Sequence, residues 1–510
     1  MIDKDKNIPP LRSDVTWEES PVPGDDSFRL FDALLGRQIK VTSLGRQMAT
    51  YLDQPQSRNA LHARLNADEQ GISFDEMNGV LDHFETLQLF ESDALLAISQ
   101  RWEKMLARFR KDPASVPLVI PPGLRFECSC CGSCCSGVNI SPVTPDILAG
   151  LEGPRFDALS KNPRCHGELF VSLTTDKAEG EVVLCPSRNG RCIFVDADGL
   201  CEIHRRFGSA AKPHICRTFP FLFTLTPSGI EVSLQTECRD LLTASQGTLL
   251  SERESELREI LAHAEVVVTR PFISLDRTSR VSFDAYRELR DHIISTVANM
   301  HEVGLDLAVR VMGIVRETMH QDDLVDLSAD GVATRFYRLL MGIGQSIAAL
   351  RSEPVSAAEG RFRLVTRNLD NVLSALAEAP LHMDAILTSD EHGDAATVSR
   401  ITLTASWQGR DILTAPTLLA GIGMYHLRWI LARTLAIVRC RQVNRTHLTG
   451  RDLMDAWAVV HMLFRNRSVR GVVEGYADEI GSVLGLGLPT LIAARQSLVR
   501  LDPQSDIYLY

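Results

Sequence analysis

Residues 127–137 read ECSCCGSCCSG, and this stretch decides how the middle of the chain folds. It crowds five thiols into a few positions: Cys128, Cys130, Cys131, Cys134 and Cys135. A C-x-x-C step lets two thiolates reach one metal across a tight turn, and such steps join Cys128 to Cys131 and Cys131 to Cys134. Adjacent side chains point in different directions, so we do not expect Cys134 and Cys135 to ligate as equals. Cys130 is the expected spare.

The other cysteines extend this site along the chain. Of the 12 cysteines, only Cys440 lies outside the interval from Cys128 to Cys238. Such clustering is far above the background of inert buried cysteine. Cys185 and Cys192 flank an Asn-Gly turn, and Cys201 follows the Asp-Gly turn of DADGLC. So many thiols exceed the four ligands of one zinc ion, which leaves two zinc ions or one or more iron–sulfur clusters open.

Composition and charge narrow the class of protein. A chain of 510 residues with 45% hydrophobic and 23% charged residues is globular and long enough for several domains. Its net charge of -11 argues against a general binder of nucleic acid or anionic membrane. The N-terminus has no apolar signal-peptide core, so we expect a cytoplasmic protein. The apolar stretch from Thr417 to Val438 is interrupted by charged side chains, so we expect it to be a buried helix and not a membrane span. The cytoplasm disfavours disulfides and favours metal chemistry.

The pattern predicts an α+β, mostly α chain in four parts. Residues 1–26 form a flexible tail, 27–115 a small winged-helix-like domain, 116–243 an irregular cysteine-rich metal-binding domain, and 244–510 a helical domain, expected to be a bundle. Short strand-like pieces between 170 and 235 include RCIFVD and the hairpin FLFTLTPSGIEVSLQ. The last part holds amphipathic segments such as ERESELREILAHAEVVV and MDAWAVVHMLFRNR.

The first of these domains is marked by two strand-like segments and three helical ones. FRLFDALL and RQIKVTS precede three helices, the last opening on a capping box formed by Ser73 and Glu76. This order resembles a PqqD-like winged-helix domain for peptide recognition. DNA binding is the alternative for such a fold, but the acidic last helix is a poor face for phosphates. A plain packing role remains equally open.

Two blocks of sequence resemble a known family. Cys128-x-x-Cys131-x-x-Cys134-Cys135 is similar to the CxxCxxCC (YkgJ-like) zinc- or iron-chelating proteins. The segment RCIFVDADGLCEIHRRFGSAAKPHICRTFPF resembles the flagellin lysine-N-methylase (FliB-like) branch. The resemblance implies that DADGLC and KPHICRTFPF fold back onto the first block. The implied metal ligands are Cys128, Cys131, Cys134, Cys135, Cys192, Cys201, Cys216 and Cys238, and Cys185 is added because it lies close to Cys192.

The resemblance implies an iron–sulfur protein, with 4Fe-4S favoured over zinc. It also implies an S-adenosylmethionine-dependent methyltransferase acting on lysines of flagellin, with no nucleic-acid or membrane partner. A non-catalytic metal carrier, sensor or electron-transfer module is the alternative. Arg217 is a candidate for a cofactor carboxylate or for the cluster sulfurs. No catalytic residue is assigned, although Glu127, Glu237 and Asp240 could accept a proton. His204 is a moderate ligand candidate, and His214 and His166 are weaker. GSVLGLGLPT (481–490) is interpreted as a helix–helix turn, not a nucleotide loop.

Overall fold

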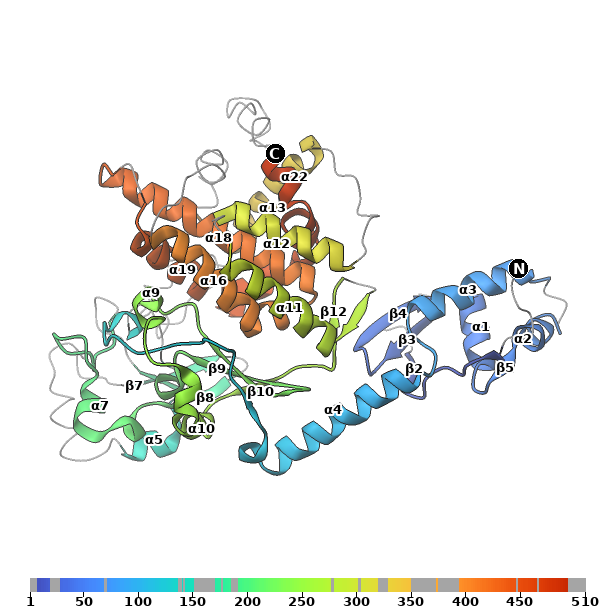
Figure 1. Cartoon of the computed structure of the whole chain (residues 1–510), viewed down its shortest axis with the longest axis horizontal. Helices are drawn as coiled ribbons and strands as arrows, with labels where there is room; N and C mark the ends of the chain where they lie inside the picture. Colours follow the sequence, from blue (N-terminus) through green and yellow to red (C-terminus); the bar gives the residue numbers. More distant parts are fainter. Residues whose placement is uncertain are drawn as a thin grey trace. The chain divides into compact units, whose positions relative to one another are not determined.

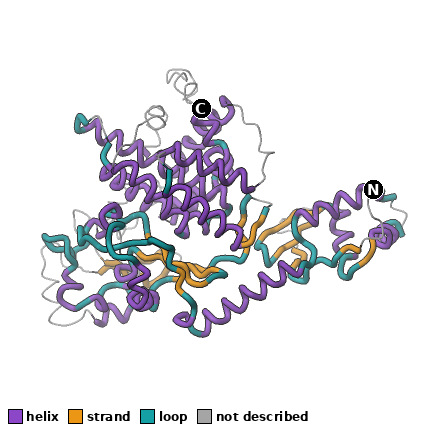
Figure 2. The backbone as a smooth tube through the Cα atoms, viewed as in Figure 1, coloured by secondary structure: helices purple, strands orange, loops and turns teal. Residues whose placement is uncertain are grey.

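The structure is a computed structural model. It describes residues 7–18, 28–67, 71–135, 140, 143–150, 170–175, 178–184, 191–276, 279–300, 304–319, 329–349, 373–374, 394–445, 448–465 and 467–493. Two compact units divide the chain: residues 1–116 with 270–286, and residues 117–269 with 287–510. Helices predominate and the strands are short, which confirms the predicted α+β, mostly α class (Figures 1 and 2).

A three-stranded antiparallel sheet and a group of helices build the first unit. The sheet has the order β2-β3-β4, and Leu30 of β3 pairs with Ile39 of β4. A short pair, β1 with β5, and the hairpin β12–β13 complete its strands. The bounds are β1 Asn7–Ile8, β2 Val15–Glu18, β3 Phe28–Asp32, β4 Arg37–Val41, α1 Ser43–Tyr51, β5 Gln56–Ser57, α2 Arg58–Leu65, α3 Phe74–Thr86, α4 Asp93–Lys111, η1 Pro113–Ser115, β12 Phe272–Ser274 and β13 Arg280–Ser282.

The core of this unit follows the predicted apolar faces. Met77, Leu81 and Phe84 of α3 are buried against sheet residues such as Leu30. The capping box is present, because Ser73 Oγ accepts from Glu76 N–H at 3.1 Å while Glu76 accepts from Ser73 N–H at 2.8 Å. β1 and β2 lie inside the segment expected to be a tail. The structure therefore assigns part of that segment to sheets.

A buried ionic network holds the β3–β4 hairpin to the end of α3. Asp32 is fully buried, accepts from Arg37 Nε at 3.1 Å and is paired with Arg12. Arg12 and Arg37 also donate to the carbonyl oxygens of Gln88 and Leu87. Two guanidinium groups thus share one carboxylate in a place that water does not reach.

The second unit contains a four-stranded sheet of order β11-β9-β10-β6. β9 and β10 form the predicted hairpin, and all their side chains are buried. RCIFVD forms no strand in the described structure; Arg191, Cys192 and Val195 make isolated bridges, that of Val195 with Cys201. The bounds in this part are β6 Leu118–Val119, η2 Ser133–Cys135, α5 Pro145–Gly150, β7 Phe170–Thr175, β8 Ala178–Leu184, α7 Glu202–Phe207, η3 Ser209–Ala211, α8 His214–Thr218, β9 Phe221–Thr226, β10 Gly229–Leu234, α9 Leu241–Ala244, η4 Leu250–Arg253, α10 Glu254–Leu261 and β11 Val266–Val268.

Two local predictions in this unit are wrong. The helix expected through ERESELREILAHAEVVV ends at Leu261, and Val266–Val268 forms β11, which pairs in parallel with β9. This pairing joins segments far apart in sequence, so no local pattern reveals it. In place of the turn expected at 481–490, the structure has a π-helix, η8, over Gly481–Leu486, and α22 from Leu488. Gly481 and Gly485 allow η8 to lie against the backbone of α18 at Leu419.

The remaining helices pack together, with α19 in contact with both α16 and α18, and α16 also against β10 (Figure 1). The expected buried helix is α18, capped by Thr417, and most of its residues are buried. No described helix meets the length and apolarity needed to cross a bilayer. The bounds are α11 Phe283–Ala298, α12 Gly304–Met319, α13 Ala329–Ala349, α16 Asp394–Gln408, α17 Arg410–Leu413, α18 Leu418–Gln442, α19 Gly450–Arg465, α20 Arg467–Gly475, α21 Ala477–Ile480, η8 Gly481–Leu486 and α22 Leu488–Ala493.

Candidate metal centre

The first cysteine loop starts from a fixed strand-like segment. Phe126 N–H donates to the carbonyl oxygen of Thr248 at 3.1 Å, and Leu250 N–H donates to that of Leu124 at 2.9 Å. Cys128 follows directly, and the loop ends in the short helical turn η2. The thiols of this loop therefore project from a backbone that is anchored at its start.

The loop carrying Cys192 and Cys201 packs onto the first loop. Cys192 N–H donates to the carbonyl oxygen of Cys135 at 2.7 Å. The Asp-Gly turn of the second loop is held by Asp196 Oδ1, which accepts from the N–H groups of Asp198 and Leu200 at 2.9 Å each. Gly199, at the tip of this turn, lies against the backbone of Cys130 and Cys131. DADGLC thus folds back onto ECSCCGSCC.

Two short helices supply the next thiols. Cys201 is the N-cap of α7, and Cys216 lies within α8. Cys192, Cys201 and Cys216 all pack against one small apolar cluster that includes Ile193, Phe194 and Ile203. This cluster brings thiols from three segments to one side of the metal-binding region.

The electrostatics of the thiols show how closely they are gathered. Burial, together with the charges of Cys216, Cys201 and Cys134, raises the pKa of Cys192 to about 12. Burial likewise raises the pKa of Cys216 to about 12; nearby Lys212 works the other way, and Cys201 and Cys134 add to the rise. The hydrogen bond to Cys135, with the Sγ atoms 3.9 Å apart, raises the pKa of Cys134.

Cys238 joins the centre from the end of β10. It is buried, and burial raises its pKa to about 12, with further contributions from the charges of Cys134, Cys131 and Cys128. Burial also raises the pKa of Cys128, and the charges of Cys130 and Cys134 add to this rise. Thiols from every cysteine-bearing segment of the described chain except α18 thus interact through their charges, and Cys134 interacts with most of them.

The donor set fits a thiophilic metal. Several thiolates that repel one another in a partly buried place are stabilised when a cation binds among them, and thiolate sulfur is the ligand of zinc and of iron–sulfur clusters. Among the residues the structure describes, no three Cys, His, Asp or Glu side chains already stand at metal-coordinating positions. The thiols are gathered into one region without being drawn to a common point.

Two predicted candidates, Cys185 and His166, lie outside the described residues, as does Cys165. Cys130 is exposed and has a positive φ of 56°, and its N–H donates to Cys128 Sγ at 3.4 Å. Its Sγ atom lies 3.8 Å from the carbonyl oxygen of Cys128. Cys440 is buried in α18, within the helical part of the chain.

The charged candidates are distributed around the thiols. Arg217 lies in α8, half-buried, and its charge together with burial lowers the pKa of His263. His214 stacks on His263 with ring centroids 5.2 Å apart, and its Nε2 lies 3.5 Å from Asp146 Oδ2. His204 is exposed on α7, and Glu127 is exposed beside Cys128. Asp240 is half-buried and accepts from Thr243 Oγ1 at 3.3 Å.

Glu237 behaves differently from these surface groups. It is buried next to Cys238, and its carboxylate lies 3.2 Å from Nδ1 of His461 in α19. His461 in turn contacts Asp411. Sequence patterns carry no signal for these partners, because they are far apart along the chain and each sits in an ordinary helical context.

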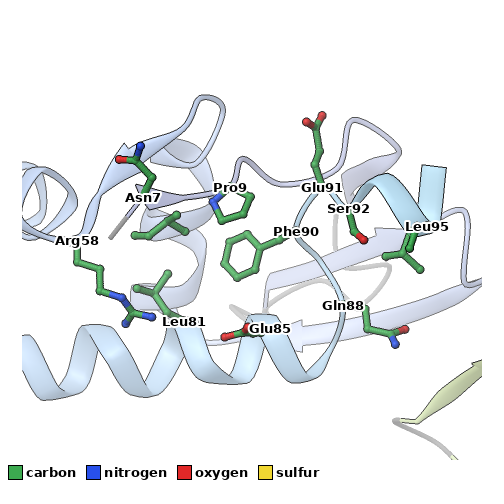
Figure 3. Close-up of a pocket in the computed structure, with 12 residues that line it drawn as sticks. Asn7, Pro9, Arg58, Leu81, Glu85, Gln88, Phe90, Glu91, Ser92 and Leu95 are labelled. Carbon is green, nitrogen blue, oxygen red and sulfur yellow. The ribbon is translucent and has the colours of Figure 1, made fainter. Parts of the chain in front are cut away.

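The first unit has a concave site of its own. A pocket of about 410 Å³ lies between the start of β1, α3 and the start of α4. Figure 3 shows Phe90 at its centre facing Pro9, with Arg58 and Gln88 towards opposite ends. The lining carries two carboxylates, Glu85 and Glu91, and one cation, Arg58, among apolar and neutral polar side chains.

Comparisons with known proteins agree with this geometry. Residues 127–240 match the family model described as "CxxCxxCC: Putative zinc- or iron-chelating domain". Over 139 residues the chain is 23% identical to "Flagellar biosynthetic protein FliU" of Salmonella muenchen, an alignment that covers 26% of this chain and 79% of that protein. No solved structure matches the chain. Residues 127–240 are therefore similar to the zinc- or iron-chelating domain that gives the CxxCxxCC family its name.

Proposed function

We propose that the chain is an iron–sulfur protein that transfers methyl groups from S-adenosylmethionine to lysine side chains of a flagellin-type protein in the cytoplasm. The observation that carries the metal part is that nine described thiols, from four segments, each lie within electrostatic reach of at least one other. That number exceeds one tetrahedral zinc site. The likeness to FliU, named as flagellar, supports the substrate class.

The proposed ligands are those that the charges connect. Cys128, Cys131 and Cys134 act on Cys238, and Cys134 also acts on Cys192 and Cys216. The charge of Lys212 works against the rise in the pKa of both Cys134 and Cys216, so it offsets negative charge that thiolates would bring. When bound, an iron–sulfur cluster supplies a centre that can accept or release an electron.

Methyl transfer requires a neutral lysine amine placed in line with the methyl donor. A carboxylate near the thiols could take the proton, and Glu127 and Asp240 lie beside ligand cysteines. Arg217 is the proposed partner for the carboxylate of S-adenosylmethionine, because a guanidinium binds carboxylates in a bidentate way. The pocket of the first unit, with Glu85 and Glu91 at its lining, suits a lysine-bearing segment of the substrate.

The test begins with anaerobic purification of the full chain, metal analysis and a visible spectrum. Iron, acid-labile sulfide and broad sulfur-to-iron absorption are expected. Colourless protein with stoichiometric zinc would exclude the cluster. The purified protein is then incubated with flagellin and S-adenosylmethionine, and lysine methylation is followed by mass spectrometry. A cluster without methylation would favour a carrier, sensor or electron-transfer module.

A further inference from the structure

The carboxylate of Glu237, next to the proposed ligand Cys238, contacts a helix of the C-terminal part of the chain. Glu237 precedes Cys238, and both are buried, with 7% and 8% of their surface exposed. Glu237 Oε1 lies 3.2 Å from Nδ1 of His461, a residue of α19 that is 2% exposed. A ligand-bearing turn after β10 is thus tied to a helix more than two hundred positions further along the chain.

The contact continues beyond His461. Its Nε2 lies 2.7 Å from Asp411 Oδ2 on α17, and the same oxygen lies 3.4 Å from Nη1 of Arg428 on α18. Four charged or titratable side chains therefore contact one another in a row: Glu237, His461, Asp411 and Arg428. Trp457 flanks it, with its ring centroid 5.7 Å from that of His461.

The charges of these four side chains balance only when His461 is protonated. Burial works against an imidazolium, but the carboxylates of Glu237 and Asp411 outweigh it and raise the pKa of His461. Glu237 and His461 are the buried members, with 6% and 2% of their side chains exposed, so removing either one takes a close charged partner from the other in a place that water barely reaches.

Side chains that hold ligand-bearing residues in place govern how firmly a metal is retained. We propose that His461, Asp411 and Arg428 are positioning residues for Cys238: acting through Glu237, they fix Cys238 as a ligand and make metal retention depend on the helical bundle. This inference rests on the proposed metal binding at the thiols.

A matched control lies on β10, the strand that precedes the turn of Glu237 and Cys238. Glu231 of β10 is 4% exposed and pairs with Arg290 of α11 at 2.6 Å, so it also ties β10 to a helix through a buried carboxylate. Its variant Glu231→Gln should cost similar stability without acting on Cys238. It separates general loosening of the sheet from an effect on the ligand.

The experiment measures metal release from full-length, anaerobically purified protein into excess chromophoric chelator. Glu237→Gln and His461→Leu should release metal about 10- to 100-fold faster than the wild type, and the metal's charge-transfer spectrum should shift. Glu231→Gln should release metal at close to the wild-type rate. His461→Gln, which keeps volume and hydrogen-bonding capacity, provides a second variant with an intermediate rate if His461→Leu folds poorly by circular dichroism.

Each outcome decides between the proposals. A wild-type protein that holds no metal overturns the proposed function, and this inference with it. A wild type that holds metal, with His461 variants releasing it at the wild-type rate, overturns only the inference. Equal acceleration by Glu231→Gln also overturns it, because the effect would then be general destabilisation.

Discussion

Gly132 and Gly199 pack backbone against backbone where the two cysteine loops meet. A Cβ atom at Gly132 would lie 2.8 Å from the carbonyl oxygen of Gly199, and one at Gly199 would lie 2.9 Å from that of Cys130. Both residues have positive φ, 67° and 81°. The approach of the loops, which brings Cys131 and Cys134 towards Cys192 and Cys201, thus depends on two positions without side chains.

Alanine at either position should separate the loops. Gly132→Ala and Gly199→Ala each add a backbone clash to a left-handed conformation, at a cost of about 1–3 kcal/mol, and bound metal per chain should fall by about half or more. Gly123→Ala is the control, because Gly123 has a φ of 74° but a Cβ atom there would meet no atom within 4 Å. Metal content after gel filtration is the measurement. Equal loss in all three variants would contradict the role of the contact.

Cys134 and Cys130 should differ sharply as targets of substitution. The charge of Cys134 acts on Cys128, Cys192, Cys216 and Cys238, so Cys134→Ser should remove most of the bound metal. Cys130→Ser should leave metal content near the wild-type value, because it preserves the N–H that donates to Cys128 Sγ. Metal analysis of the two purified variants checks this. Similar losses from both would show that Cys130 is also a ligand.

Local chemistry made some parts of this chain predictable. The capping box at Ser73 and the apolar spacing of α3 are read from neighbouring residues, and the structure has both. Cysteine spacing likewise pointed to a metal-binding region, which the family match supports. β11 and the π-helix η8 were missed because their conformations depend on distant partners, β9 and the backbone of α18.

The same limit applies to the candidate site. The ligand set proposed from spacing and resemblance remains a prediction. The tie from Glu237 to His461 depends on how α19 packs against the turn after β10. Neither residue has a sequence context that distinguishes it from a solvated glutamate or a packed histidine.

His426 should make the helical part sensitive to acid. It is buried in α18, its Nδ1 lies 2.6 Å from the carbonyl oxygen of Leu484, and burial lowers its pKa from 6.5 to about 4. The folded state therefore resists a proton that the unfolded chain accepts. His426 in its neutral form therefore contributes about 3 kcal/mol to the free energy of unfolding above pH 6.5, and this contribution is lost as the pH falls towards 4.

Unfolding of metal-free protein at several pH values, followed by tryptophan fluorescence, measures this loss. His426→Gln should flatten the dependence between pH 6.5 and about 4 while leaving the slope at lower pH, which carboxylates set. An unchanged slope in the variant would show that His426 is accessible to protons in the folded protein.

Asp32 should be the most costly single charge to remove from the first unit. It is fully buried between Arg12 and Arg37, so Asp32→Ala leaves two guanidinium groups in the interior, at a cost of about 3–5 kcal/mol. Asp14→Ala is the matched variant: its side chain is 34% exposed and lies 3.1 Å from Arg12, and its loss should cost about 1 kcal/mol. Hydrogen exchange of full-length protein, resolved for peptides of β3 and β4, gives both values. Comparable protection in the two variants would mean that Arg12 and Arg37 find other partners or reach water when Asp32 is gone.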